Sequence, residues 1–195
     1  MSDDCPLAEF SRWQRCAVAA ADPMATCFVL ATVGEHGRPS ARVVSYRPGP
    51  GGEFRFFTNS GSRKGRELSD NPEVAALFFW RTRGRQVRLE GEARRVPAHL
   101  SDQYFDQRSL EHRVSAALSA QSQPIESIDQ LRKTHARVVA GHRSQGTSPP
   151  RPSAWSGYEL EIRSVELWQS GLHRLAERRL HRRAGQRWAV ELLAP

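Results

Sequence analysis

The stretch CFVLATVGEHGRPSARVVSYRPGPGGEFRFFTN (residues 27–59) decides the fold of this chain. Three runs rich in β-branched and aromatic residues predict strands at 27–33, 40–47 and 54–59. The two segments between these runs are rich in glycine and proline, which predicts tight turns. Strand, turn, strand, turn, strand is the pattern of an antiparallel meander, so the sequence predicts a sheet built from neighbouring hairpins.

The strand pattern continues towards the C-terminal end of the sequence. EVAALFFW (73–80) is apolar throughout and predicts a fully buried strand. RQVRLEGEARRV (85–96) alternates apolar and polar residues, as a longer strand does. Strands are also predicted over GYELEIRSVELWQ (157–169), HRLAERRLHRR (173–183) and QRWAVELLAP (186–195).

Helices are predicted around these strands at 9–20, 60–72, 99–108 and 125–141. Ser60 or Ser62 is expected to cap the helix within 60–72. A Pro/Ser/Gly loop at 144–155 is too short to separate two domains. We therefore expect one domain over 1–195, with an N-terminal helical arm over 1–22. The predicted fold is α+β, a β-barrel of roughly six to eight strands with peripheral helices.

Composition excludes several classes of protein. The chain has 38% hydrophobic residues and a net charge of +8 that comes almost entirely from arginine spread along the sequence. Such scattered charge predicts a solvated surface, and we expect no nucleic-acid partner. No apolar run approaches about 18 residues and no secretory signal pattern is present, so no membrane partner is expected. The cysteines Cys5, Cys16 and Cys27 form no disulfide or metal pattern, which predicts a cytoplasmic location.

Common motifs for nucleotide, metal and nucleophile chemistry do not occur in the sequence. No GxGxxG follows a strand, and there is no Walker A motif. The histidines form no HExxH pair, and we expect no metal site. No nucleophile elbow is present either.

The segment from Arg42 to Lys64 carries a different signal. It brings Arg47, Arg63 and several hydroxyl residues close to a predicted helix start. A helix N-terminus, hydroxyl donors and cationic side chains together suit a phosphate monoester. Arginines exposed at strand ends would explain the same residues about as well.

Taken in order, several segments resemble the pyridoxamine 5′-phosphate oxidase family. These are 30–47, FFTNSGSRKGRELSDNPEVAALFFW (56–80), 85–96, YFDQR (104–108), SAQSQPI (119–125), ELWQSGLHRL (166–175) and the closing LAP (193–195). GSRKGREL also resembles the phenazine-biosynthesis oxidases of the same superfamily. The resemblance implies an FMN-binding split barrel that forms a homodimer with FMN at the subunit interface. It also implies oxidation of an amine or alcohol carbon, with hydride transfer to FMN and O2 as the acceptor.

The resemblance also implies which residues contact the cofactor. These positions are Arg42, Val43, Phe57, Thr58, Arg63, Lys64, Gln86, Gln121, Ser122, Trp168 and Arg178. Arg63 and Lys64 match the pair that neutralises the FMN phosphate, and Phe57 replaces a more usual Tyr. Trp168 and Arg178 match contacts that reach the flavin of the partner subunit.

The implied substrate positions are Arg47, Tyr104, Arg108, His112 and Arg174. Tyr104 and Arg108 match residues that grip the substrate phosphate. Arg47 stands where the family usually has Lys, and His112 stands where a small hydroxyl residue is expected. Arg174 is expected over the substrate ring as the catalytic residue, whereas Ala176 occupies the family's histidine position and lacks its proton-handling imidazole.

Three functions follow from these observations. The first is oxidation of pyridoxamine or pyridoxine 5′-phosphate to pyridoxal 5′-phosphate. The second is a tailoring oxidase of phenazine or other specialised metabolism, because Arg47, His112 and Ala176 all change the substrate side. The third is a protein without turnover, either a flavin-binding barrel or a basic RNA-binding module.

Overall fold

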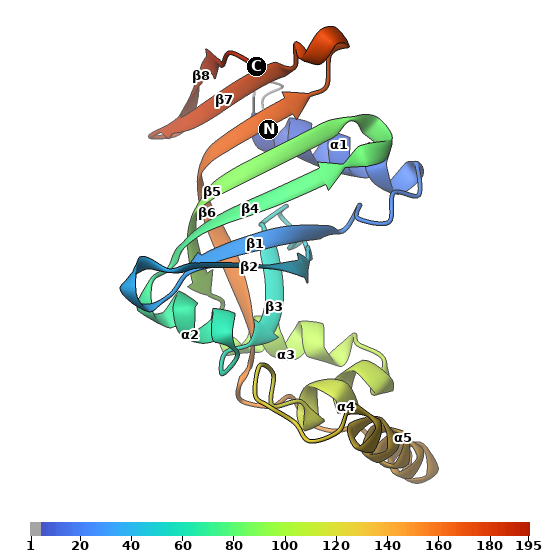
Figure 1. Cartoon of the computed structure of the whole chain (residues 1–195). Coiled ribbons are helices and arrows are strands. Elements are labelled where there is room, and N and C mark those ends of the chain that lie inside the picture. Colours follow the sequence, from blue (N-terminus) through green and yellow to red (C-terminus); the bar gives the residue numbers. More distant parts are fainter. Residues whose placement is uncertain (1–4) are drawn as a thin grey trace.

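The computed structural model describes residues 5–195 as a curved antiparallel sheet, with helices at one end and along one side (Figure 1). The α-helices are α1 (Pro6–Ala19), α2 (Arg63–Asp70), α3 (Ala98–Asp106), α4 (Leu110–Leu118) and α5 (Ile128–Gln145). The strands are β1 (Cys27–Val33), β2 (Pro39–Ser45), β3 (Arg55–Asn59), β4 (Glu73–Trp80), β5 (Arg85–Arg95), β6 (Trp155–Gln169), β7 (Glu177–Ala184) and β8 (Arg187–Leu192). Short 3₁₀ turns are η1 (Glu35–Gly37), η2 (Arg81–Arg83) and η3 (Leu172–Arg174).

The strand order is β2-β1-β4-β5-β6-β7-β8, and β3 pairs with β6 outside this path. The predicted β1–β2 hairpin is confirmed, but the predicted pairing of the third strand with β2 is wrong. The two strands are joined only by a hydrogen-bonded turn, in which Arg47 N–H donates to the Arg55 carbonyl at 2.8 Å and Gly49 N–H donates to the Glu53 carbonyl at 2.9 Å. β6 is long enough to pair with β5 along most of its length and with β3 at its first residues. These two pairings close the sheet into a split barrel.

Aromatic side chains fill the barrel. Phe28, Phe56, Phe78 and Trp80 are fully buried, and Phe10 brings α1 against this cluster. The prediction that β4 is buried on both faces is wrong, because its residues alternate between buried and more exposed. The outward face of β4 is apolar as well, with Phe79 half exposed. An apolar outer face is typical of a strand that faces a partner molecule.

The N-terminal helix agrees with the predicted arm, of which residues 1–4 lie outside the described residues. The predicted helix 99–108 ends earlier, at Asp106, and α4 begins a separate helix that the sequence pattern did not distinguish. Ser109 causes this break, because its hydroxyl caps α4 by accepting from His112 N–H at 3.4 Å. None of the helices in the described part of the chain is long and apolar enough to span a bilayer.

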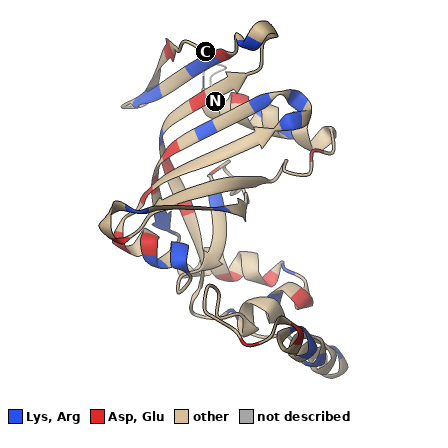
Figure 2. Cartoon of the chain, viewed as in Figure 1, with Lys and Arg blue, Asp and Glu red and all other residues tan. Residues whose placement is uncertain are grey.

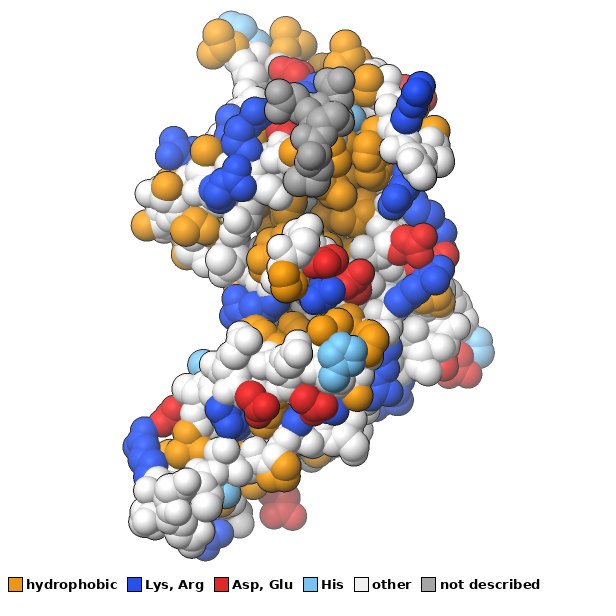
Figure 3. All heavy atoms as spheres, turned by 180° about the vertical axis from the view of Figure 1, so that it is seen from behind, with side chains coloured by type: hydrophobic (Ala, Val, Ile, Leu, Met, Phe, Trp, Pro, Cys, Tyr) orange, Lys and Arg blue, Asp and Glu red, His pale blue; other side chains and the backbone are white. Residues whose placement is uncertain are grey.

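Charge is scattered over the molecule. Figure 2 shows Lys and Arg on the sheet, on α2 and on the helical end rather than in one patch. In the view from behind, hydrophobic atoms gather in the upper part and recur as smaller patches lower down, among charged side chains (Figure 3). The charged side chains are scattered because the arginines are spread along the whole sequence.

Candidate active site

A cavity of about 570 Å³ lies between β2, β3, α2 and the α4–α5 connection, and is called the α2 cavity below. Most of the predicted cofactor residues line it: Arg42, Val43, Phe57, Thr58, Arg63, Lys64, Gln121 and Ser122. β3 and the start of α2 deliver the polar groups, because the chain turns directly from one into the other. The structure therefore brings together residues that come from three separate stretches of sequence.

The turn into α2 depends on two small residues. Ser62 caps the helix, and its hydroxyl accepts from Gly65 N–H at 3.3 Å. A Cβ atom at Gly65 would lie 2.3 Å from the Ser60 carbonyl oxygen, so only glycine fits there. The turn aims Lys64 inward while Arg63 remains largely exposed at the rim of the cavity.

Lys64 is the cation at the centre of this site, with only 8% of its surface exposed. Its Nζ donates to Thr58 Oγ1 and Gln121 Oε1, each at 3.1 Å, and to Ser62 Oγ at 3.3 Å. Burial and then the nearby Arg42 lower the pKa of Lys64 to about 8, against an opposing effect of Glu67. All three acceptors are neutral, so the ammonium charge is available to an anion.

Glu67 is a site residue that the sequence reasoning missed. This carboxylate is 6% exposed and accepts from Thr32 at 2.5 Å, Ser40 at 2.6 Å and Arg63 at 2.8 Å. It also accepts from Arg42 at 3.2 Å. Burial alone would raise its pKa, but these hydrogen bonds and the Arg42 charge hold the pKa at about 2. The sequence did carry one sign of this residue: Glu67 follows Arg63 by four positions, a spacing that places oppositely charged side chains side by side on a helix.

A second cavity of about 440 Å³ adjoins the first through Ser45 and Phe57, which line both. We call it the arginine cavity, and its other lining residues are Arg47, Tyr104, Gln107, Arg108, Ser109, His112 and Trp155. Four of the five predicted substrate positions therefore lie here, and Arg174 does not.

Aromatic rings form one wall of the arginine cavity. Phe57 stacks on Tyr104 with 4.1 Å between ring centroids and on Trp155 with 5.1 Å. The guanidinium of Arg108 lies 5.0 Å from the Trp155 ring centroid. Trp155 was missed from the sequence because it closes a loop rich in proline and serine, where no strand pattern marks it.

Arg108 carries the unsatisfied charge of this cavity. Its Nη1 is buried and has no hydrogen-bond partner within residues 5–195. Burial lowers the pKa of Arg108, Tyr104 opposes that shift, and the nearby Arg47 lowers the pKa further. Two guanidinium groups and an orphaned N–H donor make a site that suits an oxyanion.

Three predicted cofactor residues lie elsewhere, on β5, β6 and β7. Gln86 pairs with Trp168, and Trp168 pairs with Arg178, so the three form one cross-strand row. None of the three residues lines the α2 cavity, and β7 lies in the upper part of the molecule in Figure 1, whereas α2 lies in the lower part. Arg174 lies near the row in η3, exposed and with a φ of 66°. The predicted strand over 173–183 is therefore wrong at its start, because His173 and Arg174 both adopt left-handed backbone.

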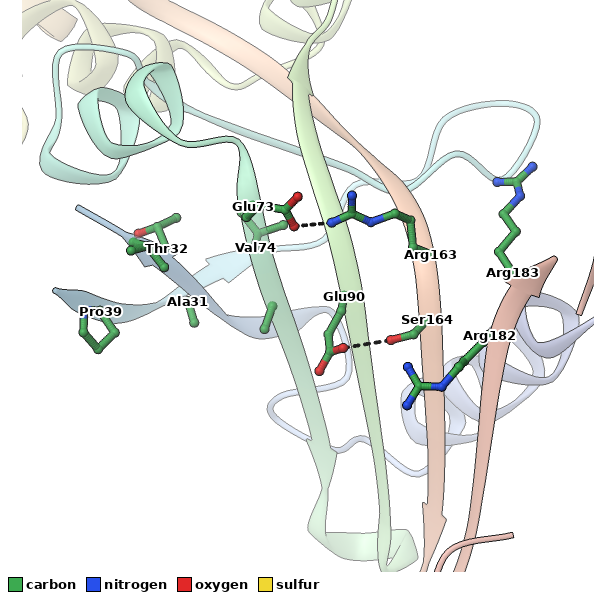
Figure 4. Close-up of a pocket in the computed structure, with 12 residues that line it drawn as sticks. Ala31, Thr32, Pro39, Glu73, Val74, Glu90, Arg163, Ser164, Arg182 and Arg183 are labelled. Carbon is green, nitrogen blue, oxygen red and sulfur yellow. Dashed lines mark hydrogen bonds and ion pairs between the residues drawn. The ribbon is translucent and has the colours of Figure 1, made fainter. Parts of the chain in front are cut away.

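A further hollow of about 580 Å³ opens over β1 and β4 to β7 (Figure 4). Its charged groups are paired only in part: Arg163 contacts Glu73, and Ser164 donates to Glu90 at 3.0 Å. Arg182 and Arg183 also line the hollow, and neither contacts a carboxylate of residues 5–195. None of the predicted site residues lines it. The hollow is therefore set apart from the other two cavities by the lack of predicted cofactor and substrate residues in its lining.

Comparison with known proteins gives a consistent picture. Residues 17–140 match the family model described as pyridoxamine 5′-phosphate oxidase. Residues 155–195 match the model described as the pyridoxine 5′-phosphate oxidase C-terminal dimerisation region. The pyridoxine/pyridoxamine 5′-phosphate oxidases of Herminiimonas arsenicoxydans and Burkholderia lata are each 42% identical to this chain, over 97% of it and 89% of their own length.

Two solved structures are similar in fold. PhzG from Burkholderia lata 383, in complex with tetrahydrophenazine-1-carboxylic acid, has a TM-score of 0.91 at 30% identity and covers 100% of this chain and 94% of its own. A pyridoxamine 5′-phosphate oxidase-related, FMN binding protein from Nostoc punctiforme has a TM-score of 0.72 at 19% identity, over 93% of this chain and 97% of its own. The second likeness concerns the fold alone.

Proposed function

The chain belongs to the pyridoxamine 5′-phosphate oxidase family and is an FMN-dependent oxidase, and on this premise we propose that it oxidises pyridoxine or pyridoxamine 5′-phosphate to pyridoxal 5′-phosphate. The observation that carries the proposal is the arginine cavity, where Arg47 and Arg108 meet with an orphaned N–H donor. A phosphate dianion supplies the acceptors that these donors lack.

The α2 cavity fits the phosphate of FMN. Lys64 is buried among neutral acceptors, and Arg63 lies at the rim beside the start of α2. Bound phosphate would compensate the Lys64 charge and would accept hydrogen bonds from Thr58 and Gln121. Glu67 acts behind these groups, because it fixes Arg42 and Arg63 on the cavity wall.

The chemistry supplied by bound FMN is removal of two electrons from the substrate carbon, with O2 as the final acceptor. The residues of this chain bind and orient the substrate for that reaction. Arg47 and Arg108 hold the phosphate, and the rings of Phe57 and Tyr104 offer a flat wall that excludes water. Because Phe57 lines both cavities, a substrate held by Arg108 lies next to the cofactor.

The remaining residues are proposed to act across the dimer interface. The match to a dimerisation region supports a homodimer. The cross-strand row and Arg174 lie away from the cavities of their own chain, so we assign them to the site of the second subunit. There Arg174 would orient the substrate ring, and Ala176 would leave the site without an imidazole.

A second candidate function is oxidation of a carboxylated phenazine precursor. It is favoured by the full-length likeness to the PhzG complex and by Ala176, which removes an imidazole from the substrate side. A carboxylate could use the same two arginines as a phosphate. We further propose one domain over the whole chain and a cytoplasmic location, which is supported by the three free cysteines.

Anaerobic reduction of the flavin tests the proposal. The FMN-loaded protein would be mixed without O2 with pyridoxine 5′-phosphate, pyridoxamine 5′-phosphate or tetrahydrophenazine-1-carboxylic acid, while the visible flavin absorbance is followed. Rapid bleaching by the vitamin B6 phosphates supports the first function. Bleaching by the phenazine alone would replace it with the second.

A further inference from the structure

A buried carboxylate on the outer face of the sheet has no part in the chemistry described above. Glu166 on β6 is only 3% exposed. It pairs in register with Arg88 on β5 and Leu180 on β7, next to the cross-strand row of Gln86, Trp168 and Arg178. Carboxylates at this level of burial persist only when charged partners compensate them.

Arg178 is the main partner of Glu166. Its Nε and Nη2 both lie 2.8 Å from Glu166 Oε1, which is a side-on grip of the guanidinium. Arg88 Nη2 lies 2.9 Å from the other carboxylate oxygen. The third nitrogen of Arg178, Nη1, donates to the Ala194 carbonyl at 3.0 Å. The Arg178 carbonyl accepts from Leu193 N–H at 2.9 Å, so the end of the chain is fastened to the same residue.

These contacts fix the orientation of the Arg178 side chain. A guanidinium has five N–H donors in a rigid plane, and the contacts above use three of its nitrogens once each. Two N–H donors remain for a ligand. An arginine whose rotamer is already fixed loses little side-chain entropy when it binds that ligand.

We propose that Glu166 is the positioning residue for Arg178, so that the carboxylate determines how well the second subunit's FMN is bound. The inference rests on the proposed assignment of Arg178 to the cofactor. Glu166 itself does not touch the cofactor, and it acts only through the guanidinium that it grips.

A double-mutant cycle on FMN affinity tests this role. FMN would be titrated into apo-protein by quenching of flavin fluorescence, for the native chain, Glu166→Gln, Arg178→Ala and the double variant. Glu166→Gln keeps the shape but loses the charge, and we expect it to weaken binding by about tenfold. The double variant should bind no more weakly than Arg178→Ala, because Glu166 has no effect once the guanidinium is absent.

Matched variants separate positioning from general stability. Glu90→Gln removes a carboxylate on the same face that also contacts Arg88 but not Arg178, and FMN affinity should not change. Glu166→Asp keeps the charge with a shorter reach and should restore part of the affinity. If Glu166→Gln does not fold, the same cycle is run with Glu166→Asp. Size-exclusion chromatography verifies the dimer for each variant.

Two results would overturn the proposal: an FMN affinity unchanged by the Glu166 substitution, or independent, additive losses in the double variant. FMN titration uses no substrate, so its result stands even if vitamin B6 phosphates fail to reduce the flavin. A failure of the proposed oxidation and a failure of this inference are therefore distinguishable.

Discussion

The α2 cavity and the cross-strand row are built in different ways. The α2 cavity takes its charges from one continuous stretch, Arg42 to Lys64, and Glu67 and Gln121 complete their hydrogen bonds within one chain. The row of Gln86, Trp168 and Arg178 is aligned only by the register of three strands, and it lies apart from that cavity. The difference is the basis of our proposal that one subunit supplies the phosphate end of a cofactor site and that the other subunit completes it.

Replacement of Lys64 should have the largest effect. Lys64→Ala is expected to weaken FMN binding by about 100-fold, because the phosphate loses its buried cation. Fluorescence titration of the apo-protein with FMN measures this loss. Lys133→Ala, at the exposed lysine on α5, is the matched control and should bind as the native chain does.

Mixed dimers test the division between the two regions directly. Lys64→Ala and Arg178→Ala chains, co-expressed in equal amounts, should recover about a quarter of native activity in the whole mixture. Random pairing makes about half of the dimers heterodimers, and each heterodimer has one intact site of two. Each variant alone should have far less at the same FMN concentration. Lys64→Ala mixed with Arg63→Ala is the control and should not recover, since both residues belong to one cavity. Equal recovery in both mixtures would refute the division.

Arg108→Ala tests the arginine cavity. The KM for pyridoxamine 5′-phosphate should rise by about 30-fold, because the phosphate loses a charged donor, while kcat changes much less. Steady-state oxygen consumption measures both constants. Arg132→Ala, on the exposed face of α5, should leave them unchanged. An unaltered KM in Arg108→Ala would remove this residue from the substrate site.

The pH dependence of FMN binding should be the smallest effect. The pKa of Lys64 is lowered to about 8 by burial, so the apo-protein loses this charge as pH rises through that value. FMN affinity should therefore fall about tenfold from about pH 7 to pH 9. In Lys64→Arg the guanidinium stays protonated, and the affinity should be nearly flat over the same range. A flat profile in the native chain would show that Lys64 is not the titrating group.

Local features of the fold could be predicted from the sequence. The strands of the β1–β2 hairpin and the cap of α2, which was expected at Ser60 or Ser62, depend on residues a few positions apart, and both agree with the structure. The pairing of β3 with β6 was not predictable from such patterns, because it joins Phe57 to Gly157 across about half of the chain. Most partners of Glu67, and the stacking partner Phe57 of Trp155, lie on other elements, so local patterns gave little sign of either residue.

The sequence by itself determined the family-like order of motifs, the approximate positions of most strands, and the cluster of cations between Arg42 and Lys64. Only the tertiary structure decided that the predicted cofactor residues separate into a cavity and a distant row, and that Glu166 grips Arg178. The physical reason is the separation along the sequence of the residues that make each contact. Periodicity, turns and caps are set by neighbouring residues, whereas strand register, burial and charge pairing are set by contacts between residues far apart in the chain.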